Sequence, residues 1–124
     1  MSDETDEMRA FLTEAIVTTY VALAEALTKL PVPITLPRGP VFQSKELTSA
    51  VSRVVEIIKD QPIDMEIQAH VWGASLYWNA AARLLGVWLH AEEPSKVAAV
   101  EIELVLNDAA DAILHLTELL DRQE

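Results

Sequence analysis

Residues 64–90 read DMEIQAHVWGASLYWNAAARLLGVWLH, and the spacing of their apolar side chains predicts a helix. Asp64 is a suitable residue to cap its first turn. The apolar positions cover an unusually wide arc, and such a helix lies centrally in a bundle or at a subunit interface. They are Ile63, Ile67, Val71, Trp72, Leu76, Trp78, Leu84, Leu85, Val87 and Leu89. We therefore expect residues 64–90 to form the central helix of an all-α protein.

Helical periodicity also marks the regions on both sides of this helix. Residues 5–30 and 44–59 carry apolar stripes, and the break Asp60-Gln61-Pro62 separates the second stripe from the central helix. Glu93-Pro94-Ser95 opens a fourth stripe that continues almost to the end of the sequence. The pattern predicts a four-helix bundle, with a long Pro-rich connector between helices 1 and 2 and an antiparallel hairpin of helices 3 and 4.

The connector is PVPITLPRGPVFQ, residues 31–43, in which four prolines and a glycine exclude a regular helix. At about 3.1 Å per residue, an extended path could run the length of a bundle. Its apolar side chains favour packing against the helices. We expect one domain over residues 1–124, with residues 1–4 frayed.

Composition narrows the classes of function. Twenty acidic and nine basic residues give a net charge of −11, which repels phosphate backbones and argues against direct nucleic-acid binding. No apolar run reaches the roughly 20 residues that cross a bilayer, and the acidic start MSDETDEM is unlike a signal peptide. The chain has no cysteine, hence no disulfide and no thiolate metal site. We expect a cytoplasmic protein without membrane contact.

Two kinds of partner fit this sequence. A short chain has difficulty covering every side of so apolar a helix, and Trp72, Trp78 and Val87 in particular favour a homodimer. Arg83, which projects among apolar neighbours, then suits an ion pair between subunits. The acidic surface serves solubility, or alternatively docks on another protein with a basic surface.

One polar stripe is the sharpest functional candidate. In DAADAILHLTELLD, residues 108–121, the side chains Asp108, Asp111 and His115 share one side of a helix. If the hairpin turn is centred near residues 92 and 93, facing residues have numbers that sum to about 185. His70 is then level with His115, and Tyr77 with Asp108. A Glu-x-x-x-His pair that begins at Glu66 would face an Asp-x-x-x-His pair on the next helix.

This arrangement allows three interpretations. Two imidazoles and two or three carboxylates could bind zinc, manganese or iron. Without a metal, a histidine held by a carboxylate could act as a general base, with His70, Tyr77, Asp111 and His115 as the catalytic residues. Further ligand contacts would come from Glu66, Trp72, Trp78, Arg83 and Asp108. The third interpretation is purely structural, with each histidine bonded along its helix seam, and we assign no cofactor and no metal site.

Asp108-x-x-Asp111 before an apolar helix resembles the second acidic motif of the all-α MazG-type nucleotide pyrophosphohydrolases, which hold magnesium between neighbouring helices. That family also has a Glu-Glu-x-x-Glu motif, whereas residues 44–59 contain only Glu46 and Glu56 as acids. The resemblance covers one of two motifs, and we do not assign the family. We expect a non-catalytic acidic interaction or accessory module; the alternative is a small enzyme or ligand-binding protein with a site between helices 3 and 4.

Overall fold

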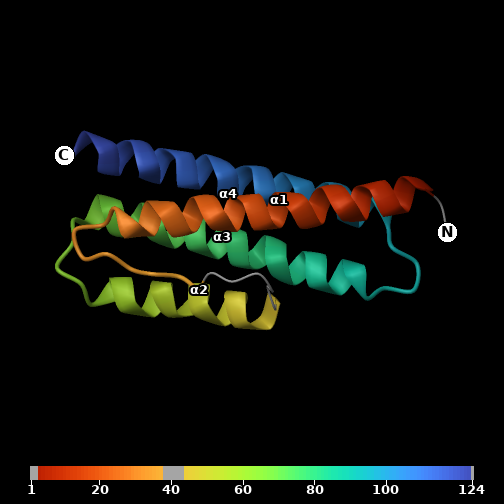
Figure 1. Cartoon of the computed structure of the whole chain (residues 1–124), viewed down its shortest axis with the longest axis horizontal. Helices are drawn as coiled ribbons and strands as arrows, with labels where there is room; N and C mark the ends of the chain where they lie inside the picture. Colours follow the sequence, from red (N-terminus) through yellow and green to blue (C-terminus); the bar gives the residue numbers. More distant parts are fainter. Residues whose placement is uncertain (1–2, 38–43, 124) are drawn as a thin grey trace.

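Four helices make up the computed structural model, which describes residues 3–37 and 44–123. They are α1 (Asp3–Thr28), α2 (Ser44–Lys59), α3 (Met65–Leu89) and α4 (Lys96–Arg122). The described residues contain no strand, so the predicted all-α class is confirmed. α1 begins at Asp3, earlier than the expected start at residue 5. In Figure 1 all four helices lie roughly along the long axis of the molecule.

Side-chain caps set where α3 and α4 begin. The Asp64 carboxylate accepts a hydrogen bond from the backbone N–H of Glu66 at 2.8 Å, as the sequence predicts. Ser95 caps α4 in the same way, because its hydroxyl accepts a hydrogen bond from the N–H of Ala98. These caps bind N–H groups that have no partner within the first helical turn.

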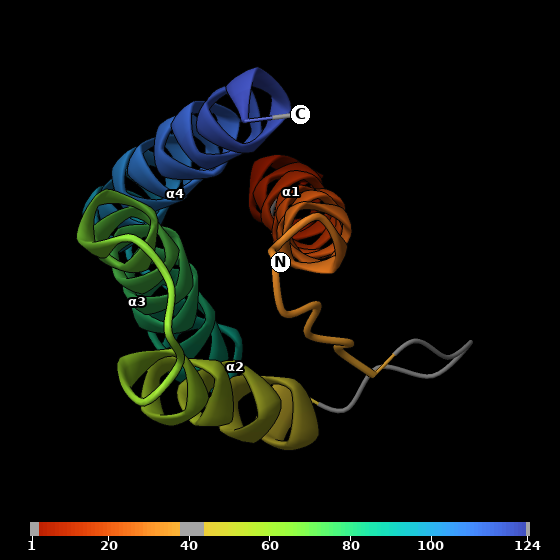
Figure 2. The same ribbon diagram turned by 90° about the vertical axis from the view of Figure 1, so that its left-hand side faces the viewer.

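α3 is the central helix, because it packs against each of the other three. α1 also packs against α4, whereas the backbones of α1 and α2 do not approach each other, although both helices contribute to the main core cluster. Figure 2, seen nearly along the helices, shows α4, α3 and α2 following an arc with α1 beside α4. In this arrangement one side of α3 faces away from the other helices.

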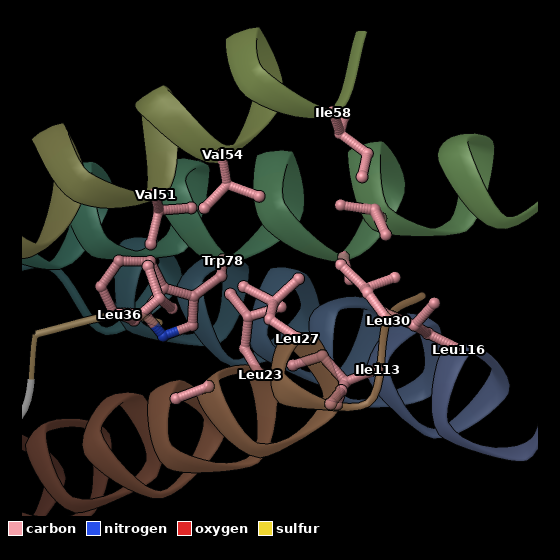
Figure 3. Packing of buried hydrophobic residues seen from close by; sticks show 14 of the residues in the cluster. Leu23, Leu27, Leu30, Leu36, Val51, Val54, Ile58, Trp78, Ile113 and Leu116 are labelled. Carbon is pink, nitrogen blue, oxygen red and sulfur yellow. The ribbon is translucent and has the colours of Figure 1, made fainter. Parts of the chain in front are cut away.

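The main core gathers on the inner side of this arc (Figure 3). Trp78 is only 1% exposed, and its ring lies 5.2 Å from that of Tyr20 between centroids. The indole N–H of Trp78 donates to the Ile16 carbonyl at 3.0 Å, which ties α3 to α1. Trp78, expected on an apolar side that could serve an interface, thus lies in the core. The same core cluster contains Leu23, Leu27, Val51, Val54, Ile67, Val71, Ile113 and Leu116.

The first part of the connector packs onto α1. The N–H of Ile34 donates to the Leu27 carbonyl at 3.1 Å, and the Tyr20 hydroxyl donates to the Pro37 carbonyl at 2.7 Å. Leu36 is buried in the core cluster. The rest of the connector, residues 38–43, lies outside the described residues. The expected packing of its apolar side chains Val41 and Phe42 against the helices therefore stays a prediction.

By length and composition alone, the α1 segment Glu4–Thr28 could cross a membrane. A helix that packs in the core of a soluble protein meets the same criterion, and α1 contributes Leu12, Tyr20, Leu23 and Leu27 to the two core clusters. This finding decides neither for nor against a membrane, so the expected cytoplasmic location stays a prediction.

Two buried polar side chains lie on the α2 side of α3. Asn79 donates from Nδ2 to the Ser52 hydroxyl at 2.9 Å and to the Thr48 carbonyl at 3.3 Å. Within the described residues, the Ser75 hydroxyl has no hydrogen-bond partner although the side chain is fully buried. A buried hydroxyl without a hydrogen-bond partner lowers stability. The Ser52 hydroxyl, by contrast, accepts one hydrogen bond from the Asn79 side chain and so stabilises the fold.

Ser75→Ala and Ser52→Ala should therefore change stability in opposite directions. Ser75→Ala removes an unpartnered buried hydroxyl and should raise the free energy of unfolding by about 1 kcal/mol. Ser52→Ala is the same chemical change in a neighbouring helix, but it removes a partner of Asn79 and should lower that free energy by about 1 kcal/mol. Urea unfolding followed by circular dichroism measures both. A loss of stability in Ser75→Ala would contradict this account.

Candidate functional site

The side of α3 that points away from the other helices is apolar along most of its length, with Arg83 as its one cation. We call this surface the α3 outward face and define it by Met65, Ala69, Trp72, Leu76, Tyr77, Ala80, Leu84 and Val87. These positions are three or four residues apart for most of the helix, the spacing of a single helical side. The core stripe, which contains Ile67, Val71 and Trp78, occupies the opposite side. α3 therefore carries two apolar sides, of which the structure covers one.

The exposed area of this face is large for a monomer. Its six large apolar side chains are between 39% exposed, at Trp72, and 83% exposed, at Met65. At roughly 150–250 Å² for a large side chain, they present about 600 Å² of side-chain surface. The largest apolar patch on a typical monomeric protein is about 300–600 Å². The α3 outward face therefore lies at the upper end of that range, as surfaces that bind other proteins do.

The α3 outward face carries one cation and has one acid on its flank. Arg83 lies on the face itself, three residues after Ala80 and four before Val87, and Glu66 lies on the flank; both are exposed. Arg83 makes no salt bridge within the described residues, so its guanidinium is available to another molecule. The opposite charges of these two residues cancel, in a chain whose net charge is −11. A partner with the same overall charge would therefore meet little repulsion here.

Small residues shape the middle of the face. Ala69 and Ala80 are exposed, and Gly73 lies on the same side of α3. A Cβ added at Gly73 would meet nothing within 4 Å, so this part of the helix is open to an approaching molecule. Trp72 borders the small residues on the side of α2, where its indole N–H donates to the Val55 carbonyl at 3.3 Å. This hydrogen bond restrains the ring at the edge of the face.

The polar side chains predicted as a site are spread over the outer surface. The His70 ring lies half-buried, and its Nδ1 is 2.8 Å from the carbonyl oxygen of Glu66 on the same helix. Asp108, Asp111 and His115 are exposed. Among the residues that the structure describes, no hydrogen bond or salt bridge joins the α3 members of this set to the α4 members.

Tyr77 is also exposed, on the flank of the α3 outward face. In residues 3–37 and 44–123, no group of three or more histidine, aspartate or glutamate side chains could hold a metal ion. The proposed metal-binding and general-base arrangements thus gain no geometric support, and they stay predictions. The His70 contact with the Glu66 carbonyl is the kind of local hydrogen bond that the structural interpretation expects.

The sequence pattern identified only part of the α3 outward face. Trp72 and Val87 were expected there and are exposed, but the most exposed large apolar side chain, Met65, was not singled out. The signal that could have found it is the repeat Met65, Ala69, Trp72, Leu76, Ala80, Val87 on the side opposite the core stripe. Comparisons with protein-family models, with curated proteins and with solved structures each found no match for this chain.

Proposed function

We propose that this chain is a non-catalytic, acidic helical-bundle interaction module that forms a homodimer through the α3 outward face. The observation that carries the proposal is the row of uncovered large apolar side chains on the central helix. Water around these side chains is released when a second apolar surface covers them, and this release is the main driving force of association.

A second copy is the occupant that this surface fits best. A stable interface buries about 800 Å² on each partner. The six large side chains supply most of that area, and Ala69, Gly73, Ala80 and the aliphatic part of Arg83 can supply the rest. Because the charges of Glu66 and Arg83 balance on this face, two chains of charge −11 meet here with less repulsion than through an acidic surface. The small residues allow the two α3 helices to approach closely.

The finer architecture supports such a dimer. We propose that the antiparallel hairpin of α3 and α4 is the rigid platform of the module, a view supported by the packing of the two helices and by their opposite directions in Figure 1. The Pro-rich connector, residues 31–43, is proposed to span the distance between α1 and α2. The hydrogen bonds that hold residues 34 and 37 to α1 support this role.

The acidic surface is proposed to face a second kind of partner, a protein with a basic surface, in the cytoplasm. Within the described residues only Asp121 and Glu4 have basic partners, Lys29 and Lys96. Most other carboxylates are therefore free to attract a positively charged protein, and added salt should weaken that contact. The mainly apolar α3 outward face should respond less to salt than this acidic contact does.

The His/carboxylate enzyme remains the alternative proposal, and one pair of substitutions separates it from the interaction module. In the module, His70→Ala/His115→Ala should change the free energy of unfolding by less than about 1 kcal/mol and leave the dimer intact, because both side chains lie at the surface. Urea unfolding and light scattering measure this.

The contradicting outcome comes from metal analysis of the untagged protein by plasma mass spectrometry. Near-stoichiometric metal in the wild-type protein that disappears in His70→Ala/His115→Ala would replace the interaction module with a metalloenzyme. In that case the two histidines would have to converge in the working protein. Wild-type protein without bound metal would agree with the module.

A further inference from the structure

A separate cleft lies between the connector and α2, away from the α3 outward face. Its volume is about 610 Å³, within the range of about 300–1,000 Å³ typical of small-molecule sites. Residues 34–37 contribute one wall and α2 the other. The described lining residues are Ile34, Thr35, Leu36, Pro37, Lys45, Glu46, Ser49, Ala50, Arg53, Val54 and Ile57.

The floor of this cleft is apolar and rests on the core. Leu36 and Val54 are buried, and both belong to the main core cluster. Ile57 lines the cleft as well and keeps part of its side chain exposed. An apolar ligand group lying there would cover Ile57 and the half-buried Ile34 and Ala50, which still meet water.

The rim along α2 carries two cations and a hydroxyl. Lys45, Ser49 and Arg53 follow one another at intervals of four residues, which places them along one side of the helix. Within the described residues neither Lys45 nor Arg53 makes a salt bridge, whereas Lys29 and Lys96 each do. Glu46 is the one acid among the described lining residues, so the cleft carries a net positive charge.

This positive charge is unusual for the chain. The sequence has nine basic and twenty acidic residues, yet two unpaired cations border a single cleft. The cleft also lies beside the first turns of α2, and the N-terminal end of a helix dipole favours negative charge. An anion is repelled by the acidic surface of the chain and attracted to this cleft.

We propose that this cleft binds a small organic carboxylate with an apolar body, such as a medium-chain fatty acid. The apolar body lies on Ile34, Ala50 and Ile57, and the carboxylate accepts hydrogen bonds from Lys45 or Arg53. Ser49, between the two cations, donates a further hydrogen bond. The combination of an apolar floor with a few charged groups at one edge is typical of sites for such amphipathic anions. The site is independent of the dimer.

The test compares three probes with the same alkyl chain by isothermal titration calorimetry of the full chain: decanoate, decanol and decyltrimethylammonium. Decanoate should bind most tightly. Lys45→Gln/Arg53→Gln should weaken decanoate binding by about tenfold or more, because the variant loses the charge-assisted hydrogen bond to the carboxylate. Each loss of about 1.4 kcal/mol raises the dissociation constant about tenfold. The same variant should leave decanol binding unchanged. Both residues are exposed, so the fold should survive the change.

Lys59→Gln is the matched control, since Lys59 is an exposed cation on α2 outside the described lining of the cleft. It should bind decanoate as the wild-type protein does. Amide chemical shifts in nuclear magnetic resonance spectra locate the probe, and we expect changes at residues 34–37 and 45–57. Absence of decanoate binding, equal binding of all three probes, an equal loss in Lys59→Gln, or shift changes confined to α3 would each overturn the proposal.

Discussion

Leu76→Glu is expected to convert the proposed homodimer into a monomer. Leu76 lies in the middle of the α3 outward face, so a dimer through this face would bury two new carboxylates without partners. The cost is about 3 kcal/mol or more, which raises the dissociation constant at least about a hundredfold. Light scattering across a dilution series measures the mass directly. The fold of the single chain should persist, because Leu76 is outside both core clusters.

Leu114→Glu is the control for this change. Leu114 lies on α4 and, like Leu76, is 54% exposed, so the two substitutions alter the same residue type at the same exposure. A surface substitution of this kind changes stability by about 0.5 kcal/mol or less, and the dimer should remain. If Leu114→Glu dissociates the protein and Leu76→Glu does not, the interface lies on α4 and the proposed face is wrong.

Trp78→Ala should cause the largest loss of stability in the chain. The substitution empties the space between α1 and α3 and removes the hydrogen bond to the Ile16 carbonyl. Replacing a buried tryptophan by alanine lowers the free energy of unfolding by about 3–5 kcal/mol. Urea unfolding at one fixed protein concentration measures the loss, because the stability of a dimer depends on concentration.

Trp72→Ala provides the comparison within the same helix. Trp72 is partly exposed and donates a hydrogen bond to α2. Trp72→Ala should therefore lower the free energy of unfolding by less than half of the decrease that Trp78→Ala causes. It should also weaken the dimer, since the ring borders the α3 outward face. Equal stability losses in the two variants would show that the core does not centre on Trp78.

Local sequence signals predicted most of the secondary structure. The cap at Asp64, the prolines of the connector and the apolar stripes each determine helix formation within a few neighbouring residues. Their effect on secondary structure can therefore be predicted without knowledge of the tertiary structure. The sides of α3 were harder to assign. Trp72 and Trp78 both lie on an apolar helix. Only the positions of α1 and α2 decide that Trp78 lies in the core and Trp72 at the edge of the α3 outward face.

The candidate site was less predictable for a similar reason. Counting residues from the turn estimates which positions of α3 and α4 are level, but it leaves the directions of the side chains open. His70 contacts the carbonyl of its own helix, and His115 is exposed. The cleft beside α2 was missed because it depends on where the connector lies, and the spacing of Lys45, Ser49 and Arg53 indicates only a shared helical side.

The most direct test of the dimer through the α3 outward face is a distance between the two copies. The chain has no cysteine, so Glu66→Cys gives a single position for a spin label at the edge of the face. At a concentration where sedimentation gives the mass of two chains, we predict one narrow distance below about 40 Å, the length of α3 at 1.5 Å per residue. The mass of one chain at every concentration, or a dimer without coupling between the labels, would contradict the account.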